Sequence, residues 1–290
     1  MKVLPFKIPI TKGESFRVQL DDEPYFYDTL HKHGELQIMY IQEGEGTVIC
    51  GDYIGNFYPG DLFVIGPDQP HVFRSNKEHY EKGSGLRARA ISLYFDRTSF
   101  GLPFFELPEL SDLSSFMDRS LRGIQFGKHT SDKIVPAIST IESSKGLERF
   151  ITLLEILESL VAAQEYTYLS SLADKSQFDE KEGKRMSRIY EYAMRESYRT
   201  ITLEEISEVA NMTPNAFCRY FKQRTRKTFV NFLIEIRIAN VCKLLRDKEL
   251  TIAEIGYQCG FNNLSHFNRK FKSLKGMSPK DYQKKVLAIN

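Results

Sequence analysis

The sequence predicts an α+β protein of several domains, with an antiparallel β-barrel followed by an all-helical domain. The length of 290 residues is enough for two domains. Residues 16–96 contain short β-rich runs broken by Gly, Pro and Asp turns, and residues 201–276 contain a repeated helix-turn-helix pattern. With 41% apolar and 27% charged residues, the chain has the composition of a folded protein with a buried core.

The predicted barrel has four clear strands. They are rich in β-branched and aromatic residues and are separated by the turn sequences EGEG, PG and PDQP. Closely spaced strands with regular turn signals favour an antiparallel barrel or sandwich. The strands are expected at residues 36–41, 47–50, 61–65 and 89–95.

The segment from residue 31 to residue 76 resembles the cupin fold, a small β-barrel of the jelly-roll type. Two motifs carry the resemblance. The first is His31-x-His33 with the later glycines Gly44 and Gly46, and the second is Pro59-Gly60-Asp61 with Pro67-x-x-Pro70-His71. We therefore expect residues 1–100 to form a cupin-like barrel.

In metal-binding cupins the ligands are both His of the first motif, a Glu four residues later and the His of the second motif. Here Gln37 occupies the Glu position. Three imidazoles suit zinc, nickel or iron(II), but a neutral amide is a poorer ligand than a carboxylate. Glu35 lies on the same strand face and could replace it only with a shifted geometry. We expect no metal and no cofactor, with His31, His33 and His71 as the candidate ligands if a metal binds.

The positions His31, His33, Gln37 and His71 have a second interpretation as polar residues of the barrel mouth. There they have a structural role or contact an organic ligand. A small barrel can hold one small molecule. We therefore predict that these four residues bind a ligand, which makes the barrel a candidate sensor domain.

Residues 101–169 are expected to form a helical region. Its clearest helix covers residues 147–168, where an apolar stripe opposes a polar face. The stripe packs on the barrel or pairs with a second copy of the chain, and the sequence favours neither. Residues 170–187 are polar with weak periodicity and are predicted to be an interdomain linker. The stripe contains Phe150, Leu153, Leu154, Leu157, Leu160 and Val161.

The net charge of +2 hides an uneven distribution. Residues 1–183 carry 19 Lys and Arg against 28 Asp and Glu, a net charge of −9. Residues 184–290 carry 21 Lys and Arg against 10 Asp and Glu, a net charge of +11. The basic part suggests a polyanionic partner, although a solvated helical surface rich in lysine gives the same count.

The basic part contains an internal repeat. Each copy has the pattern of a helix, a tight turn and a second helix. The offset between the copies is 49 residues in the first helix and 50 in the second, so the extra residue falls in the turn. The matching positions are Glu205-Ile206 with Glu254-Ile255, and Arg219, Phe221 and Lys222 with Arg269, Phe271 and Lys272.

Local signals support both copies. Thr202-x-x-Glu205 and Thr251-x-x-Glu254 are capping boxes that start the first helix of each copy. Thr213-Pro214 starts the second helix of the first copy, and Asn262 or Asn263 starts its counterpart. Four phenylalanines spaced four apart are expected to point into the small cores: Phe217, Phe221, Phe267 and Phe271.

Residues 185–284 closely resemble the DNA-binding domain of the AraC/XylS transcription regulators. A cupin-like barrel before this domain is the usual layout of that family, so the resemblance covers most of the chain except residues 100–145. It implies that residues 188–290 form an AraC-type tandem helix-turn-helix domain. The matching residues are Thr251-Ile252-x-Glu254-Ile255, Gly260-Phe261, Ser265-x-Phe267-x-Arg269-x-Phe271-Lys272, Gly276, Ser278-Pro279-x-x-Tyr282 and, in the linking segment, Arg237-Ile238-Ala239 with Leu244-Leu245.

A long helix is expected between the two copies. Residues 229–246 would span roughly 27 Å at 1.5 Å per residue. Successive major-groove segments on one face of DNA lie roughly 34 Å apart, and the widths of the two copies can supply the difference. One chain could therefore read two adjacent groove segments.

The resemblance implies base contacts from the second helix of each copy. Arginine recognises guanine, asparagine recognises adenine, and a leucine contacts the thymine methyl group. For Arg219 and Arg269, a phosphate contact or an ion pair within the domain is the alternative. Other cations, including Lys227 and Lys272, are expected at phosphates. The predicted base-reading residues are Asn215, Cys218, Arg219, Leu264, Ser265, Asn268 and Arg269.

By the same resemblance, the protein is expected to be a sequence-specific transcription regulator, most often an activator. Its partners would be double-stranded promoter or operator DNA, a small-molecule effector in the barrel, a second copy of the chain and RNA polymerase. The chain starts without a secretion signal, has no apolar run of membrane-spanning length and has no CxxC pair among its four cysteines. We therefore expect a cytoplasmic protein without a membrane contact.

Two rival functions remain open. The first is a metal-dependent cupin enzyme, although Gln37 and the appended DNA-binding domain count against it. The sequence has no Ser/His/Asp set, phosphate loop or HExxH motif that would support other catalysis, so we expect no enzyme. The second rival is a DNA-binding dimer that responds to no ligand.

Overall fold

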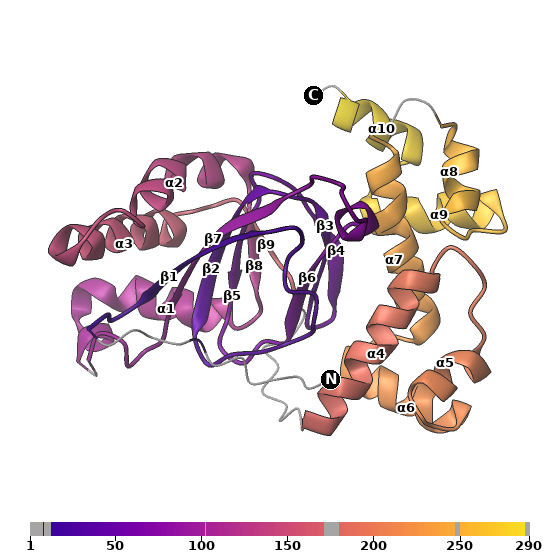
Figure 1. The fold of residues 1–290 in the computed structure, drawn as a ribbon, viewed down its shortest axis with the longest axis horizontal. Helices are drawn as coiled ribbons and strands as arrows, with labels where there is room; N and C mark the ends of the chain where they lie inside the picture. Colours follow the sequence, from indigo (N-terminus) through magenta and orange to yellow (C-terminus); the bar gives the residue numbers. More distant parts are fainter. Residues whose placement is uncertain (1–7, 9–12, 102, 171–179, 247–249, 288–290) are drawn as a thin grey trace. The chain divides into compact units, whose positions relative to one another are not determined.

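The computed structural model describes residues 8, 13–101, 103–170, 180–246 and 250–287. The chain divides into two compact units: residues 2–53 with 57–180, and residues 54–56 with 181–290. The first unit contains most of the strand residues and the helices that cover them, and the second contains residues 54–56 and the helices after residue 180 (Figure 1). This arrangement confirms the predicted α+β fold class. In the described part of the chain, no helix is both long and apolar enough to cross a lipid bilayer.

Two sheets form the barrel of the first unit. Neighbouring strands of the larger sheet run antiparallel, as do β3 (Gly46–Cys50) and β6 (His71–Ser75) of the smaller one. The smaller sheet has the order β4 (Tyr53–Phe57), β3, β6. The larger sheet has the order β1 (Arg17–Glu23), β7 (Ala88–Phe95), β2 (Leu36–Glu43), β5 (Leu62–Ile65), β8 (Ile124–Phe126) and β9 (Tyr166–Tyr168).

The four strands expected from the sequence correspond to β2, β3, β5 and β7, within one or two residues at each end. Gly46 allows the strands β3 and β6 of the smaller sheet to approach each other closely. A Cβ atom at Gly46 would lie 2.0 Å from the carbonyl oxygen of Arg74 on β6, the neighbour of Ser75, which pairs with Gly46. The glycine of the first motif is therefore required for strand pairing.

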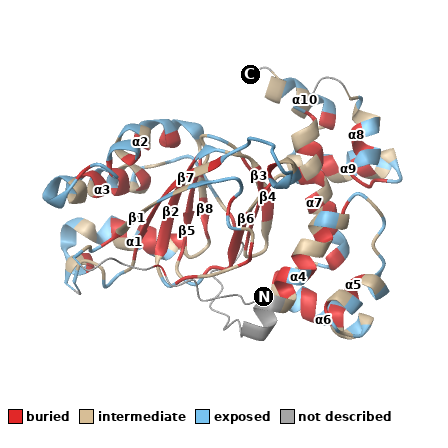
Figure 2. Cartoon of the chain, viewed as in Figure 1, coloured by how far each residue is buried: buried red, intermediate tan, exposed pale blue. Residues whose placement is uncertain are grey.

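The strands alternate between two cores. On β2, Leu36 and Ile38 belong to the core that the helices cover, whereas Met39 and Ile41 belong to the core inside the barrel. Because side chains of a strand alternate between faces, Gln37 shares the inner face with Met39. Both faces of this strand are buried, as the red colour of the central strands shows in Figure 2.

Three helices cover the outer face of the larger sheet: α1 (Ser111–Ser120), α2 (Lys128–Thr140) and α3 (Gly146–Val161). Leu153, Leu157 and Leu160 of α3 pack in the same core as Leu36 and Ile38. Packing on the barrel, one of the two alternatives for this apolar stripe, is therefore observed. Burial of one leucine contributes about 1.5–3 kcal/mol, so the stripe is a large part of the stability of this unit.

Two details of the helical region are wrong in the sequence-based prediction. The expected helix of residues 147–168 ends at Val161, and residues 124–126 and 166–168 are strands instead. β9 pairs with β8, Tyr166 opposite Phe126, and so extends the sheet. Strand pairing with a distant segment overrides the local helical pattern here.

The predicted linker is also shorter than expected. Residues 171–179 of it lie outside the described residues, but residues 180–187 are the first turns of α4 (Glu180–Glu196). The apolar face of α4 is buried through Met186, Ile189, Tyr190 and Ala193. This spacing of three and four residues matches the helical period, which the many charged residues around it obscure.

The second unit contains the predicted repeat. Capping boxes start α5 (Leu203–Val209) at Thr202 and α8 (Ile252–Gln258) at Thr251. Thr213 caps α6 (Pro214–Thr225), and Asn263, rather than Asn262, caps α9 (Leu264–Lys275). The helix starts reproduce the predicted offsets: α5 and α8 begin 49 residues apart, and α6 and α9 begin 50 residues apart. The additional residue lies in the turn between α8 and α9. The chain ends in α10 (Pro279–Leu287).

One helix, α7 (Phe229–Leu244), joins the two repeats. Its 16 residues span about 24 Å, slightly less than expected from the sequence. Near its start, Phe229 and Phe232 contact Phe221 of the first repeat at ring centroid distances of 5.5 and 5.1 Å. From its sixth residue onward, α7 and its C-cap supply five residues to the core of the second repeat: Ile234, Ile238, Val241, Cys242 and Leu245, the last of which is the C-cap.

Gly260 lies at a close contact between α4, α7 and the second repeat. Arg237 of α7 donates from Nε to the Ser197 carbonyl oxygen (2.8 Å) and from Nη2 to the Arg199 carbonyl oxygen (2.7 Å). A Cβ atom at Gly260 would lie 2.5 Å from the same Ser197 oxygen and 2.9 Å from Arg237 Nε. Since Gly260 also has φ = +86°, its backbone conformation and its surroundings both require glycine.

We predict that Gly260→Ala lowers the stability of the second unit by more than about 1 kcal/mol, because the methyl group meets backbone and the φ angle is strained. Differential scanning calorimetry should show a lower melting temperature for that unit. Gly276→Ala is the control, because its φ is also positive (+73°) but nothing lies within 4 Å of the added atom. Equal losses for both variants would mean that the contact at Gly260 is unimportant.

Candidate ligand cavity and nucleic-acid interface

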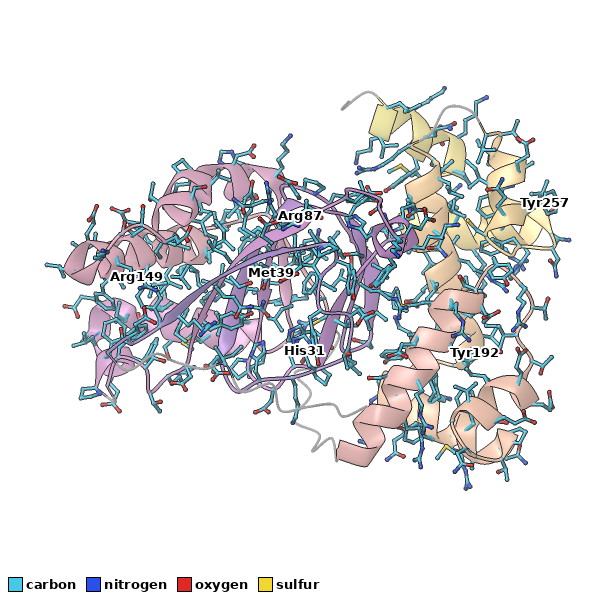
Figure 3. The ribbon with its side chains drawn as sticks, viewed as in Figure 1. His31, Met39, Arg87, Arg149, Tyr192 and Tyr257 are labelled. Carbon is cyan, nitrogen blue, oxygen red and sulfur yellow. The ribbon has the colours of Figure 1, made fainter. Side chains whose placement is uncertain are left out.

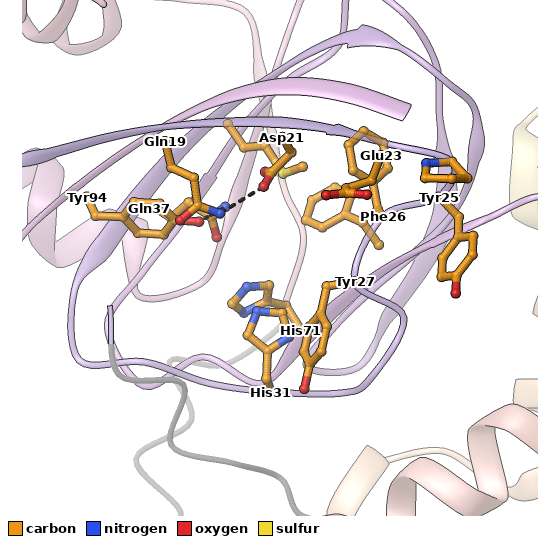
Figure 4. A pocket seen from close by; sticks show the side chains of 13 residues that line it. Gln19, Asp21, Glu23, Tyr25, Phe26, Tyr27, His31, Gln37, His71 and Tyr94 are labelled. Atoms are coloured by element: carbon orange, nitrogen blue, oxygen red, sulfur yellow. Dashed lines mark hydrogen bonds between the residues drawn. The ribbon is translucent and has the colours of Figure 1, made fainter. Parts of the chain in front are cut away.

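A cavity of about 480 Å³ lies inside the barrel. Figure 3 shows that His31 and Met39, which line it, lie among the barrel strands. Figure 4 shows His31, His71 and Tyr27 on one side and Gln19, Asp21 and Glu23 on the other. A pocket of this size can hold a small metabolite. It is lined by Gln19, Asp21, Glu23, Pro24, Tyr25, Phe26, Tyr27, His31, Gln37, Met39, His71, Phe73 and Tyr94.

The structure brings the four predicted ligand-binding residues together. His31, Gln37 and His71 line the cavity, while His33 is 4% exposed and contacts Gln37. His31 and His71 are held opposite each other by an antiparallel bridge, with backbone N–H···O distances of 3.0 and 2.9 Å. The two motifs distant in the sequence therefore meet through backbone pairing.

Each histidine of this cluster has Nδ1 next to a backbone carbonyl. The partners are the carbonyl oxygens of Thr29 for His31 (2.9 Å), Glu35 for His33 (2.8 Å) and Gln69 for His71 (2.8 Å). A carbonyl oxygen only accepts, so Nδ1 carries the ring proton and Nε2 the lone pair of each neutral ring. The Nδ1 bonds thus fix the tautomer of all three rings.

Burial keeps these rings neutral at neutral pH. It lowers the pKa of His31 to about 4 and holds the pKa of His71 well below its ordinary value. The pKa of His33 is also lowered by burial, which outweighs the opposing effect of the neighbouring Gln37 side chain. Neutral imidazoles act as hydrogen-bond acceptors or as metal ligands.

Gln37 connects the cluster to the neighbouring strand β7. Its side-chain amide donates to Ser92 Oγ (3.1 Å) and to the Tyr94 hydroxyl (3.0 Å). With that orientation its oxygen, Oε1, faces His33 Nε2 at 3.3 Å. Buried amides need such partners, because an unsatisfied polar group in a core is unfavourable.

The opposite wall of the cavity is acidic and comes from β1. Gln19, Asp21 and Glu23 alternate on one face of this strand, and Gln19 Nε2 donates to Asp21 Oδ1 at 2.8 Å. Burial raises the pKa of Asp21. Sequence reasoning missed these residues, although their spacing of two on a strand is the signal that could have found them. Among the described residues, no Lys or Arg lines the cavity.

The second helices of the two repeats, α6 and α9, present most of the predicted base-reading residues to solvent. Arg219 and Arg269 occupy equivalent positions, and both are exposed. Neither guanidinium forms a hydrogen bond or an ion pair with a described residue. Exposed side chains are also found at Asn215, Cys218, Ser265 and Asn268.

Two predicted contacts are less available. Leu264 is half-buried and packs against the core of the second repeat. Lys227, expected at a phosphate, forms an ion pair with Glu235 (2.7 Å). The sequence pattern places both residues on the outer face of a helix or turn. The burial of Leu264 and the ion pair of Lys227 depend on tertiary contacts, which the pattern does not contain.

Fold and site together define a helix-turn-helix DNA-binding protein with an attached ligand-binding barrel. Comparison with known proteins gives the same result. A family model for an AraC-like ligand-binding domain matches residues 15–134, and a model for a helix-turn-helix domain matches residues 206–285. The chain belongs to the AraC family of transcriptional regulators.

Individual relatives match over different lengths. The HTH-type transcriptional regulator YdeC of Bacillus subtilis is 37% identical over 29% of each chain. The HTH-type transcriptional activator RhaS of Mannheimia succiniciproducens is 23% identical over 87% of each chain. The transcriptional regulator LumQ of Photobacterium leiognathi is 24% identical over 94% of this chain and 97% of its own.

We predict that Gln37→Leu lowers the free energy of unfolding of the barrel by about 1–3 kcal/mol, because the hydroxyls of Ser92 and Tyr94 lose a buried partner. The melting temperature of the barrel, followed by calorimetry, measures the loss. Gln125→Leu on β8 is the matched control, since Gln125 is half-buried in the same sheet. A Gln37 variant as stable as this control would contradict the structural role of the amide.

Proposed function

We propose that this protein activates transcription at specific promoters under the control of a small molecule bound in the barrel cavity. The observation that carries the proposal is an exposed arginine at the same position of both second helices, Arg219 and Arg269, neither of which pairs with a described residue. Both lie in the part of the chain, residues 184–290, whose net charge is +11. The relatives RhaS and RhaR are named transcriptional activators, which supports activation over repression.

The chemistry of α9 suits base reading in the major groove. Arg269 can form two hydrogen bonds with guanine, and Asn268 two with adenine. Ser265 lies one turn earlier on the same helix, close to the N-terminus that enters the groove in helix-turn-helix complexes. In the first repeat, Asn215 and Arg219 offer the same pair of chemistries, while Cys218 is a weak reader. Lys222 and Lys272 are exposed cations suited to phosphates.

The cavity supports an effector with several hydrogen-bond donors. Asp21, Glu23 and Gln37 offer oxygen acceptors, and Tyr27 and Phe73 offer aromatic surface. Such a ligand controls transcription only if it binds one arrangement of the chain better than another. We propose that the barrel binds this molecule without chemical turnover, so the protein is a regulator and not an enzyme.

The remaining partners follow from this role. The protein would act on DNA in the cytoplasm, contact RNA polymerase and work as a homodimer. On α3, Leu147 and Ile151 are 73% and 47% exposed, on the side away from the stripe that packs on the barrel. This exposed apolar pair is the surface that we assign to the second copy.

We predict that Arg269→Ala weakens binding to the preferred DNA sequence by about 1–3 kcal/mol and weakens binding to random DNA much less. The preferred sequence is first selected in vitro with the wild-type chain, and both affinities are then measured at one salt concentration. Lys280→Ala, an exposed cation on α10, is the control. Equal losses on both DNAs would assign Arg269 to phosphate contact instead.

We predict that Gln19→Trp abolishes the response to the effector, because the larger side chain fills the cavity. A thermal-shift screen of metabolites identifies compounds that stabilise the wild-type chain, since a specific ligand raises the melting temperature. Leu20→Trp is the control on the same strand, because Leu20 is 45% exposed and does not line the cavity. A hit that also stabilises Gln19→Trp binds elsewhere, and a DNA affinity that no cavity ligand alters would favour the ligand-independent dimer.

A further inference from the structure

The wall of the barrel cavity carries two carboxyl groups and, among the described residues, no lysine or arginine that would balance them. Asp21 and Glu23 both line the cavity, two residues apart on β1. Asp21 is half-buried, and Glu23 is exposed at the end of the strand. An ionised carboxylate at a partly buried site is unfavourable without a cation or hydrogen-bond donors nearby. A ligand with a positive charge would stabilise both groups.

The protein itself compensates only part of this charge. Burial raises the pKa of Asp21, the hydrogen bond from Gln19 Nε2 (2.8 Å) lowers it, and the charge of Glu23 raises it again. Arg17, at the start of β1, lowers the pKa by a smaller amount and does not line the cavity. Because the pKa is raised in total, the ionised form of Asp21 is less stable here than in water. A cation in the cavity would reverse this effect.

The histidines on the other side of the cavity do not supply the positive charge. Burial lowers the pKa of His31 to about 4. Burial and the two neighbouring histidines, His31 and His33, hold the pKa of His71 well below its ordinary value. These rings are therefore neutral at neutral pH, and they add hydrogen-bond acceptors to the cavity instead of charge.

His71 offers an acceptor that no described residue uses. The side chain lines the cavity, is 1% exposed, and donates from Nδ1 to the Gln69 carbonyl oxygen at 2.8 Å. Its Nε2 therefore carries the lone pair, and this atom has no hydrogen-bond partner in the described part of the chain. Buried acceptors without a partner are rare in folded proteins, because a hydrogen bond to water has been lost and not replaced. An N–H or O–H donor of a ligand would replace it.

Aromatic rings border the same cavity. Tyr25 and Tyr27 line it and are 42% and 41% exposed. Tyr25 stacks on Tyr80 at a ring centroid distance of 4.4 Å, and the edge contact of Tyr27 with the His31 ring measures 5.1 Å. Both rings are thus held in place next to the carboxyl groups that Figure 4 shows. Since the faces of aromatic rings attract cations, the rings and the carboxylates favour the same ligand charge.

We propose that the effector is a small organic amine, bound as a cation with its charged nitrogen at Asp21 and Glu23 and a further donor group at His71 Nε2. This inference deepens the ligand-controlled function proposed above and rests on it. The cavity volume of about 480 Å³ limits the effector to the size of a small metabolite.

Other classes of small molecule suit the cavity less. A neutral polyol would use the acceptors but would leave two carboxylates unbalanced, and an organic acid would add further negative charge. A quaternary ammonium ion has no N–H group, so its charged end would form no hydrogen bond with the carboxylates. A protonated amine supplies both the charge and the donors.

The test is a thermal-shift screen of the full chain in EDTA-containing buffer without DNA. The compounds are matched sets with the same linear skeletons of about two to six carbons: diamines, amino alcohols, diols and dicarboxylic acids, together with neutral polyols. We expect only the amines to raise the melting temperature, because a ligand that binds the folded state stabilises it. The dissociation constant of the most stabilising amine is then measured by isothermal titration calorimetry.

A pair of variants tests the assigned position of the charge. Asp21→Asn removes the charge and keeps an acceptor for Gln19, and it should weaken amine binding by at least about tenfold, the effect of losing a hydrogen bond to a charged group. Asp22→Asn is the matched control. Asp22 is the next residue of β1, is exposed, accepts from Arg87 and Arg89, and does not line the cavity. Its variant should bind the amine as the wild type does.

Three outcomes would overturn the proposal: stabilisation of the wild type by neutral or acidic compounds instead of amines, no stabilisation by any amine of the set, or equal amine affinities of the Asp21 and Asp22 variants. The comparison of compounds on the wild type decides even if a variant fails to fold. A neutral or acidic compound that stabilises the wild type and not Gln19→Trp would refute the amine and leave ligand-controlled regulation intact. That function fails instead if a cavity ligand leaves the DNA affinity unchanged.

Discussion

Both DNA-reading repeats depend on a single helix. The first turns of α7 complete the aromatic core of the first repeat, and the helix from its sixth residue onward completes the apolar core of the second. Neither repeat could bury its small core without this helix. Because both repeats pack on the same helix, the position of one repeat is fixed relative to the other. Hydrophobic packing, rather than a flexible connection, therefore holds α6 and α9 at a fixed spacing.

The barrel has an analogous constraint in the alternation along β2. The same strand directs Leu36 and Ile38 toward the covering helices and Gln37 and Met39 toward the cavity. The polar interior is stable because the amide and the imidazoles have backbone or side-chain partners. The apolar outer core supports a polar site that would otherwise destabilise the unit.

Sequence patterns predicted what local rules control. The capping boxes at Thr202 and Thr251, the offset of the repeat and the phenylalanine cores depend on spacing within a few residues, and all are observed. The cavity wall of β1, the strands β8 and β9, and the ion pair of Lys227 depend on residues that meet only after folding. The motif histidines lie between these cases, since the sequence names them but only the bridge between His31 and His71 brings them together.

The proposed base-reading residues and the scaffold are chemically separate in this domain. Arg219, Asn268 and Arg269 are exposed and contribute nothing to the two cores, whereas the phenylalanines one or two positions away are fully buried. Replacing exposed side chains of this kind usually changes stability by less than about 0.5 kcal/mol. Mutation can therefore retarget such a protein to new operators while its architecture stays intact, and this decoupling lets one fold diversify across many regulons.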